Sequence, residues 1–85
     1  MTNRTVLNKI FWDQREDRKN YELTFVHRGV PGDLRRIHCK MIAHLEPSGF
    51  IYQNEEKEET FIPYHRIREI RDIRDGKVIW LSRRK

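Results

Sequence analysis

Few cysteines, glycines and prolines occur in this sequence of 85 residues, and none of its apolar runs approaches the length of a membrane span. The single cysteine, Cys39, excludes an internal disulfide and a cysteine-rich zinc site, and we expect it to be a small buried or half-buried residue. The nearby His38 and His44 have no standard metal-ligand spacing, so neither a metal nor a cofactor is predicted. The first residues lack the apolar segment of a signal peptide, and we expect a cytoplasmic protein without a membrane segment.

The chain is also short of apolar residues. Hydrophobic residues make up 36% of it and the mean hydropathy is −0.91, yet four Phe, two Trp and three Tyr are spread along its length. That spread of aromatic residues argues against disorder. We predict one small domain over residues 1–85 with a thin core, near the lower size limit for a fold without disulfides. Trp12 and Trp80 lie at element ends and are expected to pack in the core or at its rim.

Positive charge is concentrated near the C-terminus. The formal net charge is +5; residues 66–85 hold eight Lys or Arg against three acidic residues, whereas residues 1–65 hold ten of each. A concentrated basic segment favours a polyanionic partner, because binding releases counterions. Solubility alone also explains a basic protein, and we favour nucleic acid of the two.

Apolar residues at helical spacing predict a short amphipathic helix over residues 4–12, with Thr2, Asn3 or Thr5 as its N-cap. The rest of the chain has the alternation and turn residues of an antiparallel meander. The strands are expected at residues 21–26, 35–38, 42–45, 50–52, 60–62, 70–74 and 77–81. The fold class is therefore α+β, with a short N-terminal helix packed on a bent antiparallel β-sheet, for which a small partly open barrel is one available form.

Turn signals separate these strands. Residues 54–59 have the acidic composition of an exposed loop. Pro63 ends a strand or marks a sheet edge, and residues 63–66 are expected to form a tight or 3₁₀ turn. Asp75-Gly76 predicts a type I′ hairpin between the last two strands.

Two His-Arg dipeptides, His27-Arg28 and His65-Arg66, follow strand-like runs. Imidazole and guanidinium are costly to bury side by side, so such pairs are expected at a surface or a cleft. Arginine offers a planar charged fork for phosphate, and histidine adds a donor that titrates near neutral pH. The alternative is that both pairs simply face water at strand ends. Tyr64 precedes the second pair and could stack on a base or ribose.

Four segments together resemble a known family. They are residues 6–13, 26–33, 62–67 and 75–80, which read VLNKIFWD, VHRGVPGD, IPYHRI and DGKVIW. Across nearly the whole chain they are similar to the RNA cyclic-group end recognition domain, a small family with many archaeal members. The resemblance implies a module that binds RNA ends carrying a 2′,3′-cyclic phosphate, alone or beside RNA-repair and end-processing domains. It also implies that the two His-Arg pairs contact phosphate while Gly29, Gly32 and Asp33 shape the first loop.

The candidate phosphate- or RNA-binding residues are therefore His27, Arg28, Gly29, Gly32, Asp33, Tyr64, His65 and Arg66. Our first hypothesis is an RNA-binding module that recognises phosphate-bearing ends in RNA repair or processing, with RNA-processing enzymes as further partners. The second is a small ribonuclease or phosphoesterase in which His27 and His65 act as general acid and base. The third is a protein-interaction module with a basic surface. We favour the first, in which no residue is catalytic.

Overall fold

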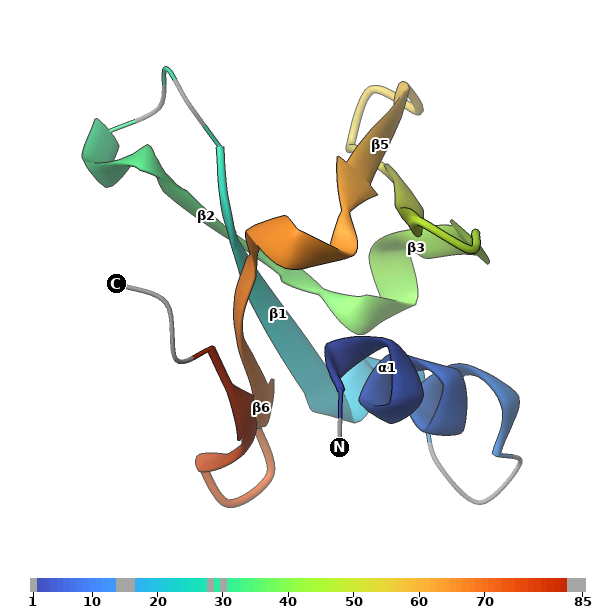
Figure 1. Cartoon of the computed structure of the whole chain (residues 1–85), viewed down its shortest axis with the longest axis vertical. Coiled ribbons are helices and arrows are strands. Elements are labelled where there is room, and N and C mark those ends of the chain that lie inside the picture. Colours follow the sequence, from blue (N-terminus) through green and yellow to red (C-terminus); the bar gives the residue numbers. More distant parts are fainter. Residues whose placement is uncertain (1, 14–16, 28, 30, 83–85) are drawn as a thin grey trace.

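The computed structural model of the protein describes residues 2–13, 17–27, 29 and 31–82 (Figure 1). These residues form one α-helix, seven strands and four short 3₁₀ turns. In chain order they are α1 (Asn3–Trp12), η1 (Arg18–Asn20), β1 (Tyr21–Val26), η2 (Pro31–Asp33), β2 (Leu34–His38), η3 (Cys39–Met41), β3 (Ile42–Leu45), β4 (Gly49–Gln53), β5 (Glu59–Pro63), η4 (Tyr64–Arg66), β6 (Ile67–Asp72) and β7 (Lys77–Leu81).

The strands form two antiparallel sheets. One has the order β2-β1-β6-β7 and the other β3-β4-β5. The chain passes from the larger sheet to the smaller one through η3 and returns through η4. These two short turns divide the strands into two sheets, where one bent sheet was expected. The predicted α+β class and N-terminal helix are confirmed, and within the described residues the two sheets remain unclosed.

Helix α1 covers the core with the face that the sequence predicts. The Thr2 hydroxyl accepts a hydrogen bond from the Thr5 backbone N–H at 3.2 Å and is the N-cap. Val6, Leu7 and Ile10 are buried against the strands. The helix thus begins one residue before the predicted start.

Aromatic rings fill much of the space between the sheets. Phe25 of β1 lies 6.0 Å from the Phe50 ring and 5.6 Å from the Tyr52 ring, measured between centroids, and both partners belong to β4. All three residues are at most 2% exposed. Trp80 packs against this core as predicted, but Trp12 is 71% exposed, so the prediction for Trp12 is wrong. It lies at the last turn of α1, beyond the reach of the sheets.

A β-bulge lies at the centre of the larger sheet. Thr24 pairs with Glu69 and Phe25 with Ile67, so Arg68 is the extra residue on β6. The bulge shifts the alternation of β6 by one position. Ile67 and Ile70 are three residues apart and yet both are buried.

The last hairpin differs from the prediction in its turn. Strand β6 ends at Asp72, which pairs with Lys77, leaving a four-residue loop. Gly76 has a φ of 74°, but Asp75 is not at positive φ, so the predicted type I′ turn is wrong. The Asp72 carboxylate accepts a hydrogen bond from the Arg74 backbone N–H at 3.0 Å, which draws the chain out of the ladder.

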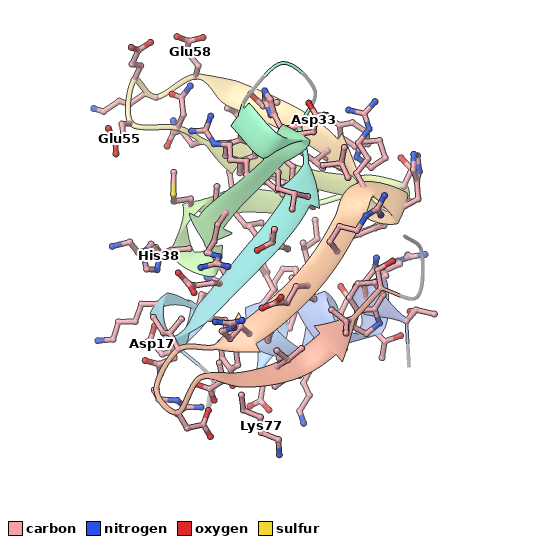
Figure 2. All side chains as sticks on the ribbon, turned by 90° about the vertical axis from the view of Figure 1, so that its left-hand side faces the viewer. Asp17, Asp33, His38, Glu55, Glu58 and Lys77 are labelled. Carbon is pink, nitrogen blue, oxygen red and sulfur yellow. The ribbon has the colours of Figure 1, made fainter. Side chains whose placement is uncertain are left out.

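The acidic segment forms an exposed loop, as predicted, although Glu59 is already part of β5. The Asn54 side chain closes it by accepting from the backbone N–H groups of Glu56 and Glu58, both at 2.9 Å. Figure 2 shows Glu55 and Glu58 at the same end of the molecule as Asp33, with Lys77 at the opposite end.

Candidate functional site

The loop between β1 and β2 carries the first candidate pair. The His27 backbone N–H donates to the Asp33 carbonyl oxygen at 2.8 Å, which closes the loop at its base. Gly29, Gly32 and Asp33 have φ values of 96°, 74° and 56°, a region that glycine enters freely and aspartate more readily than most residues. No described atom lies within 4 Å of a Cβ placed on Gly29 or Gly32, so a ligand can approach the backbone there. Arg28 lies outside the described residues.

His27 continues the inward face of β1 although the strand ends at Val26. Its ring is 6.0 Å from the Phe25 ring, between centroids, and the side chain is half-buried. One edge of the imidazole therefore rests on the aromatic core, and the residue is held more firmly than a fully exposed histidine.

The second pair lies in η4, and Tyr64 anchors that turn. The Tyr64 hydroxyl donates to the Glu46 carbonyl oxygen at 2.8 Å, and the Tyr64 backbone N–H donates to the Ser48 carbonyl oxygen at 3.2 Å. Partial burial raises the pKa of the Tyr64 hydroxyl above its ordinary value, so it remains a neutral donor. These contacts fix the ring against the core, and stacking of Tyr64 on a base stays a prediction.

Helix α1 provides a further anchor. The Asn3 side-chain amide donates to the Tyr64 carbonyl oxygen at 2.7 Å, across 61 positions of sequence. Arg68, the residue of the β-bulge, donates to the His65 carbonyl oxygen at 3.2 Å. The backbone of η4 is thus held from two sides, while the side chains of His65 and Arg66 are exposed.

Pairing between β1 and β6 brings the two candidate segments to one end of the larger sheet. Phe25 is paired with Ile67, so β1 runs out towards His27 where β6 is entered from Arg66 (Figure 1). Because the strands are antiparallel neighbours, the segment following one and the segment preceding the other must share that end. The loop and η4 therefore both extend from that end of the larger sheet.

Part of the basic C-terminal region is neutralised by neighbouring carboxylates. Arg71 lies 2.8 Å from Glu69, and Arg74 lies 2.7 Å from Asp72, between charged atoms. The hydrogen bond from Arg74 holds the pKa of the Asp72 carboxyl below its usual range. Residues 83–85, which carry three of the positive charges, lie outside the described residues.

Comparison with known families places the chain. Residues 1–81 match the family described as the MJ1316 RNA cyclic group end recognition domain. The chain belongs to this family. The resemblance inferred from the four sequence segments is thereby confirmed.

Relatives of this end recognition domain include archaeal proteins named UPF0248 proteins. One from Thermococcus sibiricus is 41% identical over 78 residues, covering 92% of this chain and 82% of the relative. Another from Pyrococcus abyssi is 40% identical over 83 residues, covering 98% and 92%. A Methanococcus maripaludis protein is 30% identical over 78 residues, covering 92% and 95%. No solved structure matches the chain significantly.

Sequence reasoning missed one arginine near the first pair of the end recognition domain. The Arg35 guanidinium carbon lies 5.9 Å from the centroid of the Tyr52 ring, and Arg35 is paired with Phe25 in the ladder between β1 and β2. The sequence signal for Arg35 is the alternation of residues between the two faces of β2. Arg35 shares a face with the buried Ile37, so it points towards the core side of the sheet.

No metal site of ordinary composition is seen in the described part of the end recognition domain, which holds no group of three or more His, Cys, Asp or Glu suited to an ion. Cys39 is completely buried, as predicted, and desolvation raises the pKa of its thiol to about 12. His38 and His44 are exposed, in keeping with ordinary surface residues. Over the same residues, no helix has the length and apolar character needed to cross a bilayer.

Proposed function

We propose that this domain binds RNA ends that carry a phosphate group, with the 2′,3′-cyclic phosphate as the preferred end. The observation that carries the proposal is the pairing of Phe25 with Ile67, which gathers the loop and η4 at one end of the sheet. The description of the family supports the same ligand.

The arrangement suits a terminal phosphate. Arg66 and His65 are exposed on an anchored turn, and they supply a charged fork and a ring donor. The loop offers backbone N–H groups beside Gly29 and Gly32, where a Cβ would meet no described atom within 4 Å. The role of Arg28 in phosphate binding remains part of this proposal.

RNA beyond the terminal nucleotide would follow the larger sheet towards its other end. Lys77 lies there, opposite the loop that contains Asp33 (Figure 2). Because Arg71 and Arg74 are already paired with carboxylates, we expect this extension to add fewer phosphate contacts than the charge count alone indicates. Roles in RNA repair or processing, partner enzymes of that kind and a cytoplasmic location remain predictions.

The test compares one short RNA prepared with a 2′,3′-cyclic phosphate, a 3′-phosphate or a 3′-hydroxyl end. We expect the cyclic end to bind most tightly, and His27→Ala and Arg66→Ala each to weaken it roughly tenfold or more without unfolding the domain. His44→Ala, an exposed histidine on β3, is the matched control and should bind as the native protein does. Equal affinity for all three ends would refute end recognition.

The same experiment tests the nuclease alternative, which the shared position of His27 and His65 also allows. The RNA is examined for cleavage after binding. Cleavage with a bell-shaped pH dependence that is lost in either histidine variant would establish an enzyme in place of a binding module. Association with an acidic protein in the absence of any RNA binding would instead favour the protein-interaction alternative.

A further inference from the structure

Arg35 and Tyr52 stand out because their side-chain polar groups make no hydrogen bond or ion pair to any described residue. The ion pairs seen among the described residues involve Lys19, Arg71 and Arg74, and none includes Arg35. Its guanidinium also makes no hydrogen bond to any described residue, although the side chain is half-buried. An arginine held in this way keeps its N–H donors available for an anion.

Tyr52 is the more unusual of the two, because it is buried while its hydroxyl has no partner among the described residues. The residue is 98% buried, with its ring packed between Phe25, Phe50 and the Arg35 guanidinium. Its hydroxyl makes no hydrogen bond to any described residue. Every buried side-chain N or O atom in the described part of the chain has a partner, so the Tyr52 oxygen must reach the surface. A buried tyrosine usually pairs its hydroxyl within the protein, and here the group is left for a ligand.

Both residues lie beside Phe25, two positions before His27 of the proposed phosphate site. The centroid of the Phe25 ring lies 6.0 Å from that of the His27 ring and 5.6 Å from that of the Tyr52 ring. Arg35 pairs with Phe25 in the ladder between β1 and β2. Three groups that can donate hydrogen bonds therefore surround one buried ring at the end of β1. The Arg35 guanidinium carbon lies 5.9 Å from the Tyr52 ring centroid, within cation–π range, which holds the charged group near the ring before a ligand arrives.

We propose that Arg35 of β2 and Tyr52 of β4 bind the terminal phosphate of the RNA where the two sheets face each other, through the guanidinium and the phenolic hydroxyl. This inference rests on the proposed function and extends it by assigning two further phosphate ligands. In this arrangement the phosphate lies between the two sheets. His27, the loop and Arg35 contact it from the larger sheet, and Tyr52 of β4 contacts it from the smaller one.

Tyr52→Phe is the decisive variant, because it removes one oxygen that makes no hydrogen bond to a described residue and leaves the packed ring in place. We expect the thermal midpoint to be unchanged and the affinity for the cyclic-phosphate RNA to fall roughly tenfold. Arg35→Lys keeps the positive charge but loses the planar fork, and it should weaken binding by a similar factor.

Arg36→Lys is the matched control. Arg36 follows Arg35 directly but lies on the opposite, exposed face of β2, where its Nε donates to the Thr24 hydroxyl at 3.3 Å. We expect this variant to bind the cyclic end as the native protein does. If Tyr52→Phe and Arg35→Lys also bind the cyclic end with native affinity, the inference is overturned while end recognition stands. If the native protein shows no end preference, the proposed function and this inference fall together.

Discussion

Gly49 has no room for a Cβ beside β5, and replacing it by alanine tests the packing of the smaller sheet. Gly49 pairs with Pro63, the last residue before η4. A Cβ at this position would meet the Ile62 carbonyl oxygen, the Phe61 ring at 2.7 Å and the Pro63 Cα at 2.9 Å. Two of the three obstructing atoms belong to the backbone, so a side-chain rotation cannot relieve the clash.

The cost can be judged from these distances. Carbon atoms in contact prefer about 3.5–4.0 Å, so β5 must move away from β4 by roughly half an ångström or more. Overpacking of this kind costs about 3 kcal/mol, the upper end of the usual range, because the strand itself has to shift. For a domain of this size that corresponds to a fall of roughly 12–24 °C in thermal midpoint.

Thermal and urea unfolding followed by circular dichroism measure the effect of Gly49→Ala. The control is Gly76→Ala, because no described atom lies within 4 Å of a Cβ there and only the φ of 74° opposes it. That strain costs about 1–2 kcal/mol. Should Gly49→Ala destabilise the domain no more than Gly76→Ala, the inference of a backbone clash is wrong.

Three further predictions follow from single contacts. Cys39 is buried, and its thiol has a pKa of about 12 against an ordinary 9.0. At pH 8 the thiol should therefore react with iodoacetamide at least about a thousandfold more slowly in the folded protein than in denaturant. Rapid labelling of the folded protein would contradict its burial. Asn3→Ala removes the hydrogen bond to Tyr64, so it should lower the free energy of unfolding by about 1 kcal/mol and weaken RNA-end binding. Asn8→Ala, elsewhere on α1, should do neither. Equal effects of the two variants would argue against the anchor. The lowered pKa of Asp72 means that its interaction with Arg74 stabilises the fold above pH 3.8 and is lost as the pH falls through the lower folded value. Asp72→Asn should therefore be less stable than the native protein at neutral pH, with a difference that shrinks in acid, and a difference independent of pH would refute the assignment.

Local patterns in the sequence predicted most of the fold. Strands β1, β3 and β7 have the predicted bounds, because alternation and turn residues mark both ends of each. Ile67, Ile70 and Ile73 have helical spacing, but the hairpin signal favours a strand after the turn over residues 63–66, and β6 does begin at Ile67. The β-bulge at Arg68 explains that spacing, since it lets a strand bury two residues three positions apart.

The candidate site was less accessible to sequence reasoning. The motifs identified both His-Arg pairs, but nothing local indicates that Phe25 pairs with Ile67, and the convergence of the two segments depends on that register. Arg35 and Tyr52 lie on different sheets and are brought together only by packing. The motifs therefore identify the His-Arg pairs of the proposed phosphate site but not Arg35 and Tyr52, which depend on packing between the sheets.

The pairing of β1 with β6 also governs how the domain can fold. Tyr21 pairs with Asp72 and Phe25 with Ile67, so about half of the chain must be in place before the central ladder closes. Closing so long a segment costs entropy before any contact repays it, which places the domain among slow-folding, high-contact-order proteins. During synthesis, β1 can pair only with β2 until β6 leaves the ribosome. The end of the larger sheet that carries both His-Arg segments is therefore one of the last features to form.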